Sequence, residues 1–196
     1  MKFYQIIKRC FDLIVALGGL IFLLPVILIV CIAVAMDSPG KIVFKQERVG
    51  KNGKIFELLK FRTMKEGSEN LKISVQEIKK IERSGNDYRV TKVGNFLRKF
   101  ALDEIPQLIN ILKGDMSFVG PRPHFLARFK DSKMLERKLV IKPGLISLAV
   151  AHGGIYLSDE ETLRYDLEYI KKQSFLLDLK IIVKTIILYS KRLYER

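Results

Sequence analysis

Cysteine and histidine are scarce in this chain of 196 residues, which has only two of each. Cys10 precedes a long apolar run and Cys31 lies inside it, so the pair gives neither a disulfide framework nor a metal-binding spacing, and we expect buried thiols. The two histidines, His124 and His152, have no partner at a spacing that would hold zinc. The sequence therefore predicts neither a disulfide-stapled fold nor a zinc site.

Acidic residues are in the minority. The chain has 21 Asp and Glu against 35 Lys and Arg, which gives a formal net charge of +14. Such an excess suits an anionic partner, and nucleic acid, acidic lipid headgroups and phosphorylated substrates are all candidates. The sequence contains no recognisable nucleic-acid-binding motif, so we predict no nucleic-acid partner. A membrane-anchored module that binds anionic lipid without catalysis stays open as an alternative.

Charge is absent from residues 13–36, which are almost entirely apolar. A helix needs about 20 apolar residues to cross the core of a bilayer, so this run is long enough. Pro25 stands in its middle, where it removes a backbone hydrogen bond and clashes with the preceding turn. We therefore predict a break near Leu24 and a re-entrant helix-break-helix over 1–37, whose two short helices enter and leave the membrane by the same face.

Lysine and arginine flank the apolar run on both sides, a pattern typical of segments that face the cytoplasm. A straight span that leaves a short N-terminal stub outside also satisfies this rule and stays open. A signal peptide fits less well, because the run exceeds the usual apolar region of about 7–15 residues and no small-x-small cleavage site precedes Asp37. We expect residues 38–196 to form one domain on the cytoplasmic face, since roughly 160 residues suffice for one core but hardly for two.

After a turn cluster at 37–40, residues 42–49 and 54–62 are rich in Ile, Val, Phe and Leu. They are separated by Lys-Asn-Gly at 51–53, a pairing that favours a tight β-hairpin. Residues 66–86 are polar and charged with sparse apolar positions, and we interpret them as a surface helix with loops and no chemistry. The two hairpin strands would carry Gln46, Arg48, Lys60 and Arg62.

An Asp-Glu pair lies close to a proline in the stretch 93–123. Proline is tolerated in the first turn of a helix, so Pro106 predicts a helix through Gln107 to Leu112 that starts near Asp103, with Asp103 at or near its N-cap. The simplest explanation is structural: Asp103 caps the helix, and Glu104 complements the positive end of its dipole.

Basic residues around this pair favour chemistry instead. Arg98 and Lys99 lie just upstream, and Arg122 is held between two prolines downstream, where a restricted backbone would aim its guanidinium at a fixed point. Paired carboxylates among arginines suit a metal-bound diphosphate. One carboxylate can attack a phosphoryl group, a divalent cation and arginines can neutralise the spreading charge, and the second carboxylate can manage protons.

With these residues the chain resembles the monotopic phosphoglycosyl transferases, also called bacterial sugar transferases, in the small form that consists of the catalytic core alone. The resemblance runs over almost the whole length, and its central motif is long and specific. The matching segments are KRCFDLIVAL at 8–17, KFRTM at 60–64, LRKFALDEIPQLINILKGDMSFVGPRP at 97–123, KPG at 142–144 and RYDLEYIKKQSFLLDLKI at 164–181.

The resemblance implies an enzyme of the bacterial inner membrane. Members transfer a phosphosugar from a UDP-sugar to a polyprenol phosphate such as undecaprenyl phosphate and release UMP, in the first membrane step of glycoconjugate assembly. The family nucleophile maps onto Asp103, which would form a covalent phosphosugar intermediate in a ping-pong mechanism. Mg²⁺ assists, with Asp103 and Glu104 as the implied metal-binding residues. Arg98, Arg122 and, within KFRTM, Lys60 and Arg62 are implied to bind substrate phosphate.

The chain departs from the family pattern at two places. Leu24 stands where members commonly carry a serine before the proline, so Pro25 alone must produce the bend, and the freed carbonyl groups need other partners. Residues 145–154 read LISLAVAHGG, where the family reads close to ITGWAQVNGR. The family Trp, Gln and terminal Arg are thereby replaced by Leu148, Val150 and Gly154.

The altered segment 145–154 indicates an unusual sugar or altered substrate contacts. A degenerate member without catalysis stays open, although the Asp-Glu pair and both arginines are intact. His152 would either supply a replacement contact or lie solvated in a loop. The sequence leaves open the sugar, the glycan pathway and the oligomeric state, and a homo-oligomer is compatible with it.

Residues 175–196 carry a wide apolar face with lysines near one side. Such a helix can lie in the headgroup region of a membrane or pack on the domain core, and the sequence does not choose between them. The fold class we expect is α+β: a mostly helical membrane-associated domain with a re-entrant N-terminal element, a small β-hairpin and interfacial amphipathic helices.

Overall fold

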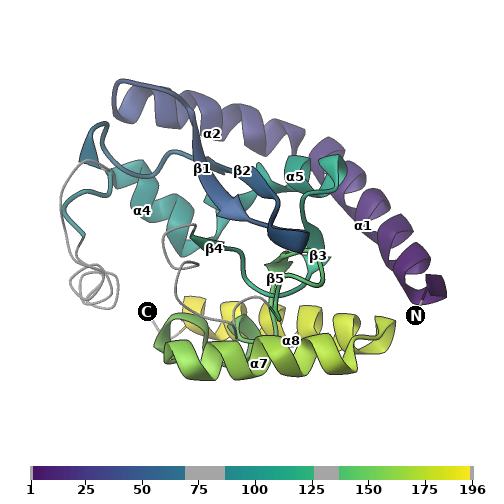
Figure 1. Ribbon diagram of the computed structural model, residues 1–196. Coiled ribbons are helices and arrows are strands. Elements are labelled where there is room, and N and C mark those ends of the chain that lie inside the picture. The colour runs from purple at the N-terminus through teal and green to yellow at the C-terminus, as the bar shows by residue number, and fades with distance from the viewer. Residues whose placement is uncertain (1, 69–86, 126–136, 195–196) are drawn as a thin grey trace.

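The computed structural model describes residues 2–68, 87–125 and 137–194 and has the mixed helix and sheet content expected of an α+β fold (Figure 1). Most of the surface helix predicted over 66–86 lies outside the described residues. The helices are α1 (Lys2–Phe22), α2 (Leu24–Asp37), α4 (Lys92–Lys99), α5 (Gln107–Lys113), α7 (Asp159–Lys172) and α8 (Phe175–Tyr194), and the strands are β1 (Val43–Val49), β2 (Ile55–Phe61), β3 (Ser117–Val119), β4 (His124–Phe125) and β5 (Gly144–Ile146).

The N-terminal helices α1 and α2 meet at a bend of 63°. Pro25 lies in the first turn of α2, where its missing N–H has no intrahelical partner to lose. The predicted break at the proline is therefore confirmed. In the described part of the chain no single helix is long and apolar enough to cross a membrane, whereas the bent pair passes that test of length and composition together. Its insertion as a re-entrant element stays a prediction.

The predicted β-hairpin is confirmed. Strands β1 and β2 pair antiparallel with Val43 opposite Phe61 and Val49 opposite Ile55. The connecting turn needs two residues with positive φ, and Asn52 (57°) and Gly53 (77°) supply them, as expected of an Asn-Gly pair. Strand β4 joins the far side of β1, so that the order is β2-β1-β4, while β3 and β5 form a separate parallel pair.

Strand β2 forms the edge of its sheet, and a side chain from α5 covers part of that edge. The Leu59 N–H donates to Oδ1 of Asn110 at 3.0 Å, and Nδ2 of Asn110 donates to the Glu57 carbonyl at 2.7 Å. Asn110 is almost fully buried. Its amide therefore satisfies two strand groups that would otherwise be orphaned in the interior.

The sheet lies between the α1–α2 layer and the α7–α8 layer (Figure 1). The bent helix pair and the later elements share one hydrophobic core, and a second cluster joins β3 to α7 and α8. The division of the chain at residue 37 stays a prediction. The first cluster includes Ala16, Val34, Phe56, Leu58, Leu97 and Ile111, and the second includes Val119, Leu148, Tyr169 and Ile181.

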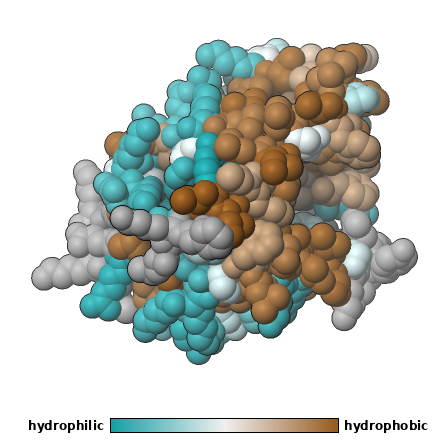
Figure 2. All heavy atoms as spheres, turned by 90° about the vertical axis from the view of Figure 1, so that its right-hand side faces the viewer, coloured by the Kyte–Doolittle hydropathy of each residue, from teal (hydrophilic) through white to brown (hydrophobic). Residues whose placement is uncertain are grey.

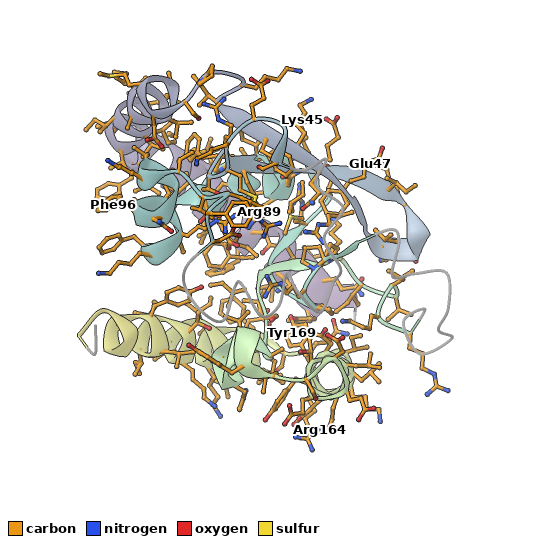
Figure 3. The ribbon with its side chains drawn as sticks, turned by 90° about the vertical axis from the view of Figure 1, so that its left-hand side faces the viewer. Lys45, Glu47, Arg89, Phe96, Arg164 and Tyr169 are labelled. Carbon is orange, nitrogen blue, oxygen red and sulfur yellow. The ribbon has the colours of Figure 1, made fainter. Side chains whose placement is uncertain are left out.

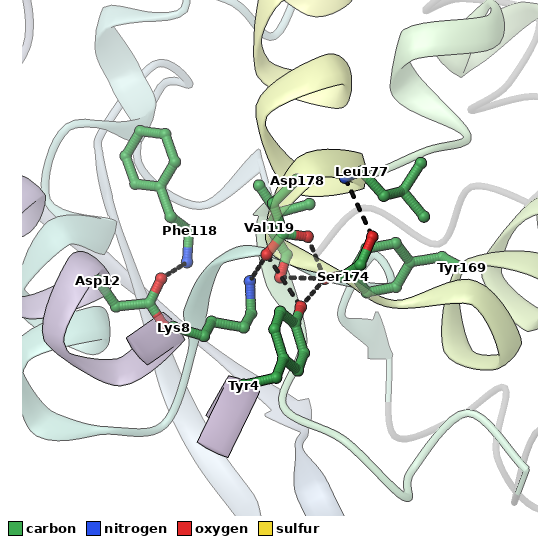
Figure 4. A network of polar contacts seen from close by, with 9 residues as sticks. All are labelled: Tyr4, Lys8, Asp12, Phe118, Val119, Tyr169, Ser174, Leu177 and Asp178. Carbon is green, nitrogen blue, oxygen red and sulfur yellow. Dashed lines mark hydrogen bonds and ion pairs between the residues drawn. The ribbon is translucent and has the colours of Figure 1, made fainter. Parts of the chain in front are cut away.

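A buried carboxylate fastens α1 to α7 and α8 (Figure 4). Oδ2 of Asp178 accepts from the Tyr4 hydroxyl at 2.9 Å and from Nζ of Lys8 at 2.7 Å, and Oδ1 accepts from the Tyr169 hydroxyl at 2.7 Å. Hydrogen bonds to an ionised group are about twice as strong as neutral ones. Asp178 therefore fixes the N-terminal half of α1 against the C-terminal layer.

Helix α8 packs on the domain core, which is one of the two alternatives that the sequence left open, and its place in the headgroup region of a membrane stays a prediction. Asp178, Ile181 and Thr185 are buried against the domain, so one face packs on the core. A second apolar face is exposed, and Lys180 and Lys184 are exposed beside it. Exposed apolar residues also lie on α1 and α2, and the view onto α1 shows a broad hydrophobic surface (Figure 2). The most exposed are Ile6, Ile14, Ile21, Phe22, Ile29, Ile32 and Met36 on the bent pair and Leu176, Val183 and Ile186 on α8.

Candidate active site

The Asp-Glu pair lies in a separate turn before helix α5. Asp103 and Glu104 belong to the 3₁₀ turn Leu102–Glu104, which follows Ala101 in a left-handed conformation (φ 54°). Helix α5 begins at Gln107 with Pro106 as its N-cap and has no side-chain cap. The prediction that Asp103 caps this helix is therefore wrong. The chain approaches α5 through tight turns, which Pro106 tolerates because it has no N–H to bond backwards.

One lysine holds both carboxylates of the pair. Nζ of Lys60, from strand β2, lies 2.8 Å from Oε1 of Glu104 and 3.5 Å from Oδ2 of Asp103. The side chain of Asp103 is 10 % exposed, whereas that of Glu104 is 33 % exposed. Neither carboxylate caps helix α5, so both remain available to a ligand that binds next to Lys60.

Burial raises the pKa of Asp103 above its usual value, and the adjacent Glu104 carboxylate raises it further. The positive charges of Lys60 and Arg98 act in the opposite direction and favour the ionised form. Carboxyl groups whose pKa is shifted by both burial and specific charges are concentrated in functional sites. Burial and specific charges therefore act together on the carboxyl group of Asp103, and its reactivity stays a proposal.

Arg98 approaches the pair from helix α4. Its Nε donates to Oγ1 of Thr63 at 2.9 Å, and its charge lowers the pKa of both Asp103 and Asp87. Helix α4 lies close to the segment that follows β2 because Gly94 has no side chain: a Cβ there would lie 2.1 Å from the Thr63 carbonyl oxygen. Lys60, Arg98, Asp103 and Glu104 are therefore brought together as the sequence suggested.

A buried ion pair that the sequence reasoning missed lies near Arg98. Nε and Nη2 of Arg89 donate to the Asp87 carboxylate at 2.8 and 2.7 Å. Figure 3 shows Arg89 directed into the interior, whereas Lys45 and Glu47 point outward from β1. The available signal was the spacing of two residues between an aspartate and an arginine, which is common in turns and carries no functional meaning alone.

Arg62 has partners other than the Asp-Glu pair. Its guanidinium donates to the carbonyl groups of Lys41, Val34 and Ser38 at 2.8, 3.1 and 2.5 Å, around the C-terminal end of α2. Arg62 is 8 % exposed. The predicted phosphate-binding role is untested, and the structure gives this side chain a set of backbone acceptors instead.

Arg122 lies beside a second lysine–carboxylate site. Nζ of Lys138 pairs with Oδ2 of Asp166, and both side chains are almost completely buried. Burial raises the pKa of Asp166 and lowers the pKa of Lys138 in spite of their mutual attraction, and the exposed Arg122 is close enough to affect both pKa values. The role of Arg122 as a phosphate binder stays a prediction.

The segment that departs from the family pattern folds into short turns after β5. His152 ends the 3₁₀ turn Val150–His152, and its Nδ1 lies 2.9 Å from the Leu148 carbonyl oxygen. Its ring stacks on Tyr165 with the centroids 4.5 Å apart. His152 is exposed yet held in place, and the replacement substrate contact that the sequence left open stays untested.

The described residues contain no group of three or more His, Cys, Asp or Glu side chains that could hold a metal ion. Asp103 and Glu104 are nevertheless adjacent carboxylates. Mg²⁺ is commonly held in proteins by one or two carboxylates together with waters and substrate phosphates. The pair therefore fits a magnesium ion that arrives with a diphosphate, and does not fit a metal caged by protein ligands alone.

The sequence model of the family described as bacterial sugar transferase matches residues 3–192, so the chain belongs to this family. It is 40 % identical over 193 residues to a UDP-glucose:undecaprenyl-phosphate glucose-1-phosphate transferase of Escherichia coli (strain K12), with 93 % of this chain and 40 % of that protein covered. A UDP-N-acetylgalactosamine-undecaprenyl-phosphate N-acetylgalactosaminephosphotransferase of Aeromonas hydrophila is 37 % identical, with 93 % and 43 % covered. The chain thus spans about two fifths of the length of these relatives.

Shorter relatives are matched over most of their length. The exopolysaccharide production protein ExoY of Sinorhizobium fredii is 38 % identical, with 91 % of this chain and 83 % of that protein covered. The exopolysaccharide production protein PSS of Rhizobium leguminosarum is 35 % identical, with 93 % and 94 % covered. The part of the longer relatives that this chain matches therefore corresponds to nearly the whole of these shorter proteins.

Proposed function

We propose that this protein transfers a phosphosugar from a UDP-sugar to a polyprenol phosphate, such as undecaprenyl phosphate. The observation that carries the proposal is the partly exposed pair of carboxylates, Asp103 and Glu104, that both face Lys60. Relatives of the chain are named as transferases of this type, which supports the same proposal. The product would be a polyprenol diphosphate sugar, and the released nucleotide would be UMP.

The proposed chemistry has two steps at Asp103. An oxygen of the Asp103 carboxylate attacks the phosphorus that bears the sugar, the bond from that phosphorus to the bridging oxygen breaks, and UMP leaves. A phosphate oxygen of the polyprenol phosphate then attacks the same phosphorus and releases Asp103. Splitting one displacement into two through a covalent intermediate is characteristic of nucleophilic catalysis. The sequence of events is ping-pong.

The neighbours of Asp103 stabilise charge during both displacements. Lys60 and Arg98 lie close enough to affect the pKa of Asp103 and would also attract the phosphate oxygens on which negative charge accumulates. Glu104 would hold protons and, with Asp103, bind Mg²⁺. When bound, the metal supplies positive charge at the diphosphate.

The bent pair α1–α2 supports a location at the cytoplasmic membrane. Its exposed apolar residues and the open face of α8 would enter the lipid, with the catalytic residues on the cytoplasmic face. Tags at the two ends should then be accessible only from the cytoplasm. A periplasmic N-terminus would show a straight span instead.

The first test is UMP release from a panel of UDP-sugars with undecaprenyl phosphate and Mg²⁺. We expect release that depends on the lipid, on Mg²⁺ and on Asp103, with Asp103→Asn lowering the rate by at least about 10³-fold and abolishing covalent labelling by a radioactive donor. Lys45→Met is a matched surface control, since its ion pair with Glu57 is exposed. Turnover retained by Asp103→Asn would remove this residue from the role of nucleophile. Silence across a broad panel would favour a donor outside the panel or a degenerate member.

A further inference from the structure

The C-terminal end of α2 is bound by an arginine from another part of the chain. The last turn of α2 contains no basic residue. Arg62 supplies the missing cation, with Nη2 donating to the Val34 and Ser38 carbonyls and Nη1 donating to the Lys41 carbonyl. The carbonyl groups at a helix C-terminus have no intrahelical partner and carry partial negative charge, so a cation there both satisfies and stabilises them.

The same helix end is bound a second time through Asp37, the last residue of α2. Oδ2 of Asp37 accepts from the Val93 N–H at 3.1 Å, in the first turn of α4. A carboxylate is unfavourable at the C-terminus of its own helix and favourable at the N-terminus of another. Asp37 therefore makes its stabilising interaction with α4.

Both of these contacts lead directly to elements that carry active-site residues. Arg62 lies two residues after Lys60 on the chain that leaves β2, and α4 carries Arg98. The hydrogen bond from Arg98 to Thr63 then joins α4 back to the segment that contains Arg62. The contacts form a closed ring that passes from α2 through Arg62 and Thr63 to α4 and returns through Asp37.

We propose that Arg62 and Asp37 are positioning residues, which fix Lys60 and Arg98 relative to the Asp103–Glu104 pair by clamping β2 and α4 to the end of α2. The proposal rests on the proposed function, in which α2 is part of the membrane element. The depth of the bent pair in the membrane then sets the position of Lys60 and Arg98, the two cations proposed to face the phosphates. Misplacing catalytic groups by about 1 Å can cost on the order of 100-fold in rate.

Steady-state kinetics of Arg62→Met separate positioning from phosphate binding. We expect kcat per folded enzyme to fall about 10- to 100-fold while KM for the UDP-sugar changes less than about 2-fold. Arg62→Lys should recover part of kcat, because an ammonium can still bond one or two carbonyls. Lys45→Met removes the same charge from an exposed ion pair and is the control.

Two kinetic outcomes would overturn the proposal. A KM raised about 10-fold or more with unchanged kcat would show that Arg62 binds donor phosphate. A loss of folded protein with normal kcat in the remainder would show a purely structural role. Asp37→Ala, which removes the acceptor of the Val93 N–H, should lower kcat in the same way. Combining it with Arg62→Met should cost less than the product of the two single effects, since both act on one clamp.

A distance measurement tests the clamp without any substrate. Nitroxide labels at Met36→Cys and Glu47→Cys, both exposed, would report the distance between α2 and β1 after Cys10→Ser and Cys31→Ala. We expect the distance distribution to broaden or shift in Arg62→Met. The milder variant Arg62→Lys should show the same change to a smaller extent, and it replaces Arg62→Met if that variant does not fold. An unchanged distribution in both variants would refute the clamp. A wild-type enzyme silent with every donor would instead refute the proposed function, while leaving the distance result valid.

Discussion

Two lysine–carboxylate sites in this molecule are built from the same residue types in different proportions. At the first, the Lys60 side chain (26 % exposed) faces two carboxylates, Asp103 (10 %) and Glu104 (33 %). At the second, Lys138 (2 %) faces a single carboxylate, Asp166 (1 %). The first site has two carboxylates for one lysine and is partly exposed, whereas the second has one carboxylate for one lysine and is closed.

The comparison shows that burial alone does not identify a reactive carboxylate. Burial raises the pKa of Asp103 and of Asp166 alike. Of the two aspartates, Asp103 has a second carboxylate beside it, and its lysine partner is partly exposed. A ligand that carries a phosphate and a metal ion could therefore reach this site from solvent. A buried ion pair such as Lys138–Asp166 gains little net stability from its charges, because desolvation offsets their attraction. Solvent access and the second carboxylate distinguish the two sites.

Breaking the closed pair should have the largest effect on stability. Lys138→Met leaves the Asp166 carboxylate buried without its cation, and we expect a loss of about 3–5 kcal/mol in the free energy of unfolding. Chemical denaturation of detergent-solubilised protein would measure it. The double variant Lys138→Met/Asp166→Leu should recover much of this loss, because it removes the stranded charge. A single variant as stable as the wild type would mean that the pair is not buried as described.

Breaking the open site at Lys60 should affect activity far more than folding. We expect Lys60→Met to lower the rate of UMP release by about 10²-fold, equivalent to about 2.7 kcal/mol, because a cation at the developing charge is lost. The cost in stability should stay below about 1 kcal/mol, as for other partly exposed ion pairs. Parallel rate and denaturation measurements test this asymmetry, and equal losses in both would contradict it.

Asp103→Asn should sharpen the comparison through the pH dependence of stability. The pKa of Asp103 is raised in the folded protein, so its ionised form opposes folding above that pKa, and the penalty vanishes once the pH falls below the unfolded-state pKa. We therefore expect a Tm equal to or above that of the wild type at neutral pH, with the difference shrinking on acidification. A Tm that is clearly lower at neutral pH would show that the carboxylate is stabilising.

The smallest effects should be opposite shifts in the acid limb of the pH–rate profile. The limb reports ionisation of the nucleophile, and Lys60 lowers the pKa of Asp103 whereas Glu104 raises it. Lys60→Met should thus move the limb to higher pH, and Glu104→Gln should move it to lower pH. Residual activity measured between pH 4 and 9 would suffice. Shifts in the same direction would show that the acid limb does not report the ionisation of Asp103.

Features set by local chemistry were predictable from the sequence. Pro25 breaks the helix wherever the surrounding chain lies, and the Asn52-Gly53 pair takes the positive φ values of a tight turn. The cluster of Lys60, Arg98 and the Asp-Glu pair was suggested by motif resemblance. These predictions needed no knowledge of which distant segments meet.

Features set by tertiary contact were not predictable in this way. The turn at Asp103 depends on the left-handed Ala101 and on packing against β2, and nothing in the local sequence demands it over a helix cap. Arg62 was expected to face phosphate, yet its acceptors lie more than twenty residues earlier in the chain. The Lys138–Asp166 pair likewise joins segments far apart, and a single sequence carries no signal for that meeting.

The amide of Asn110 has a consequence for how molecules of this protein meet one another. An unpaired edge strand is a template on which a strand from another chain can add. The contacts of Asn110 with Leu59 and Glu57 occupy one donor and one acceptor of β2, much as the peptide group of a neighbouring strand would. The Asn110 side chain therefore blocks the addition of a further strand at this edge, and with it edge-to-edge aggregation.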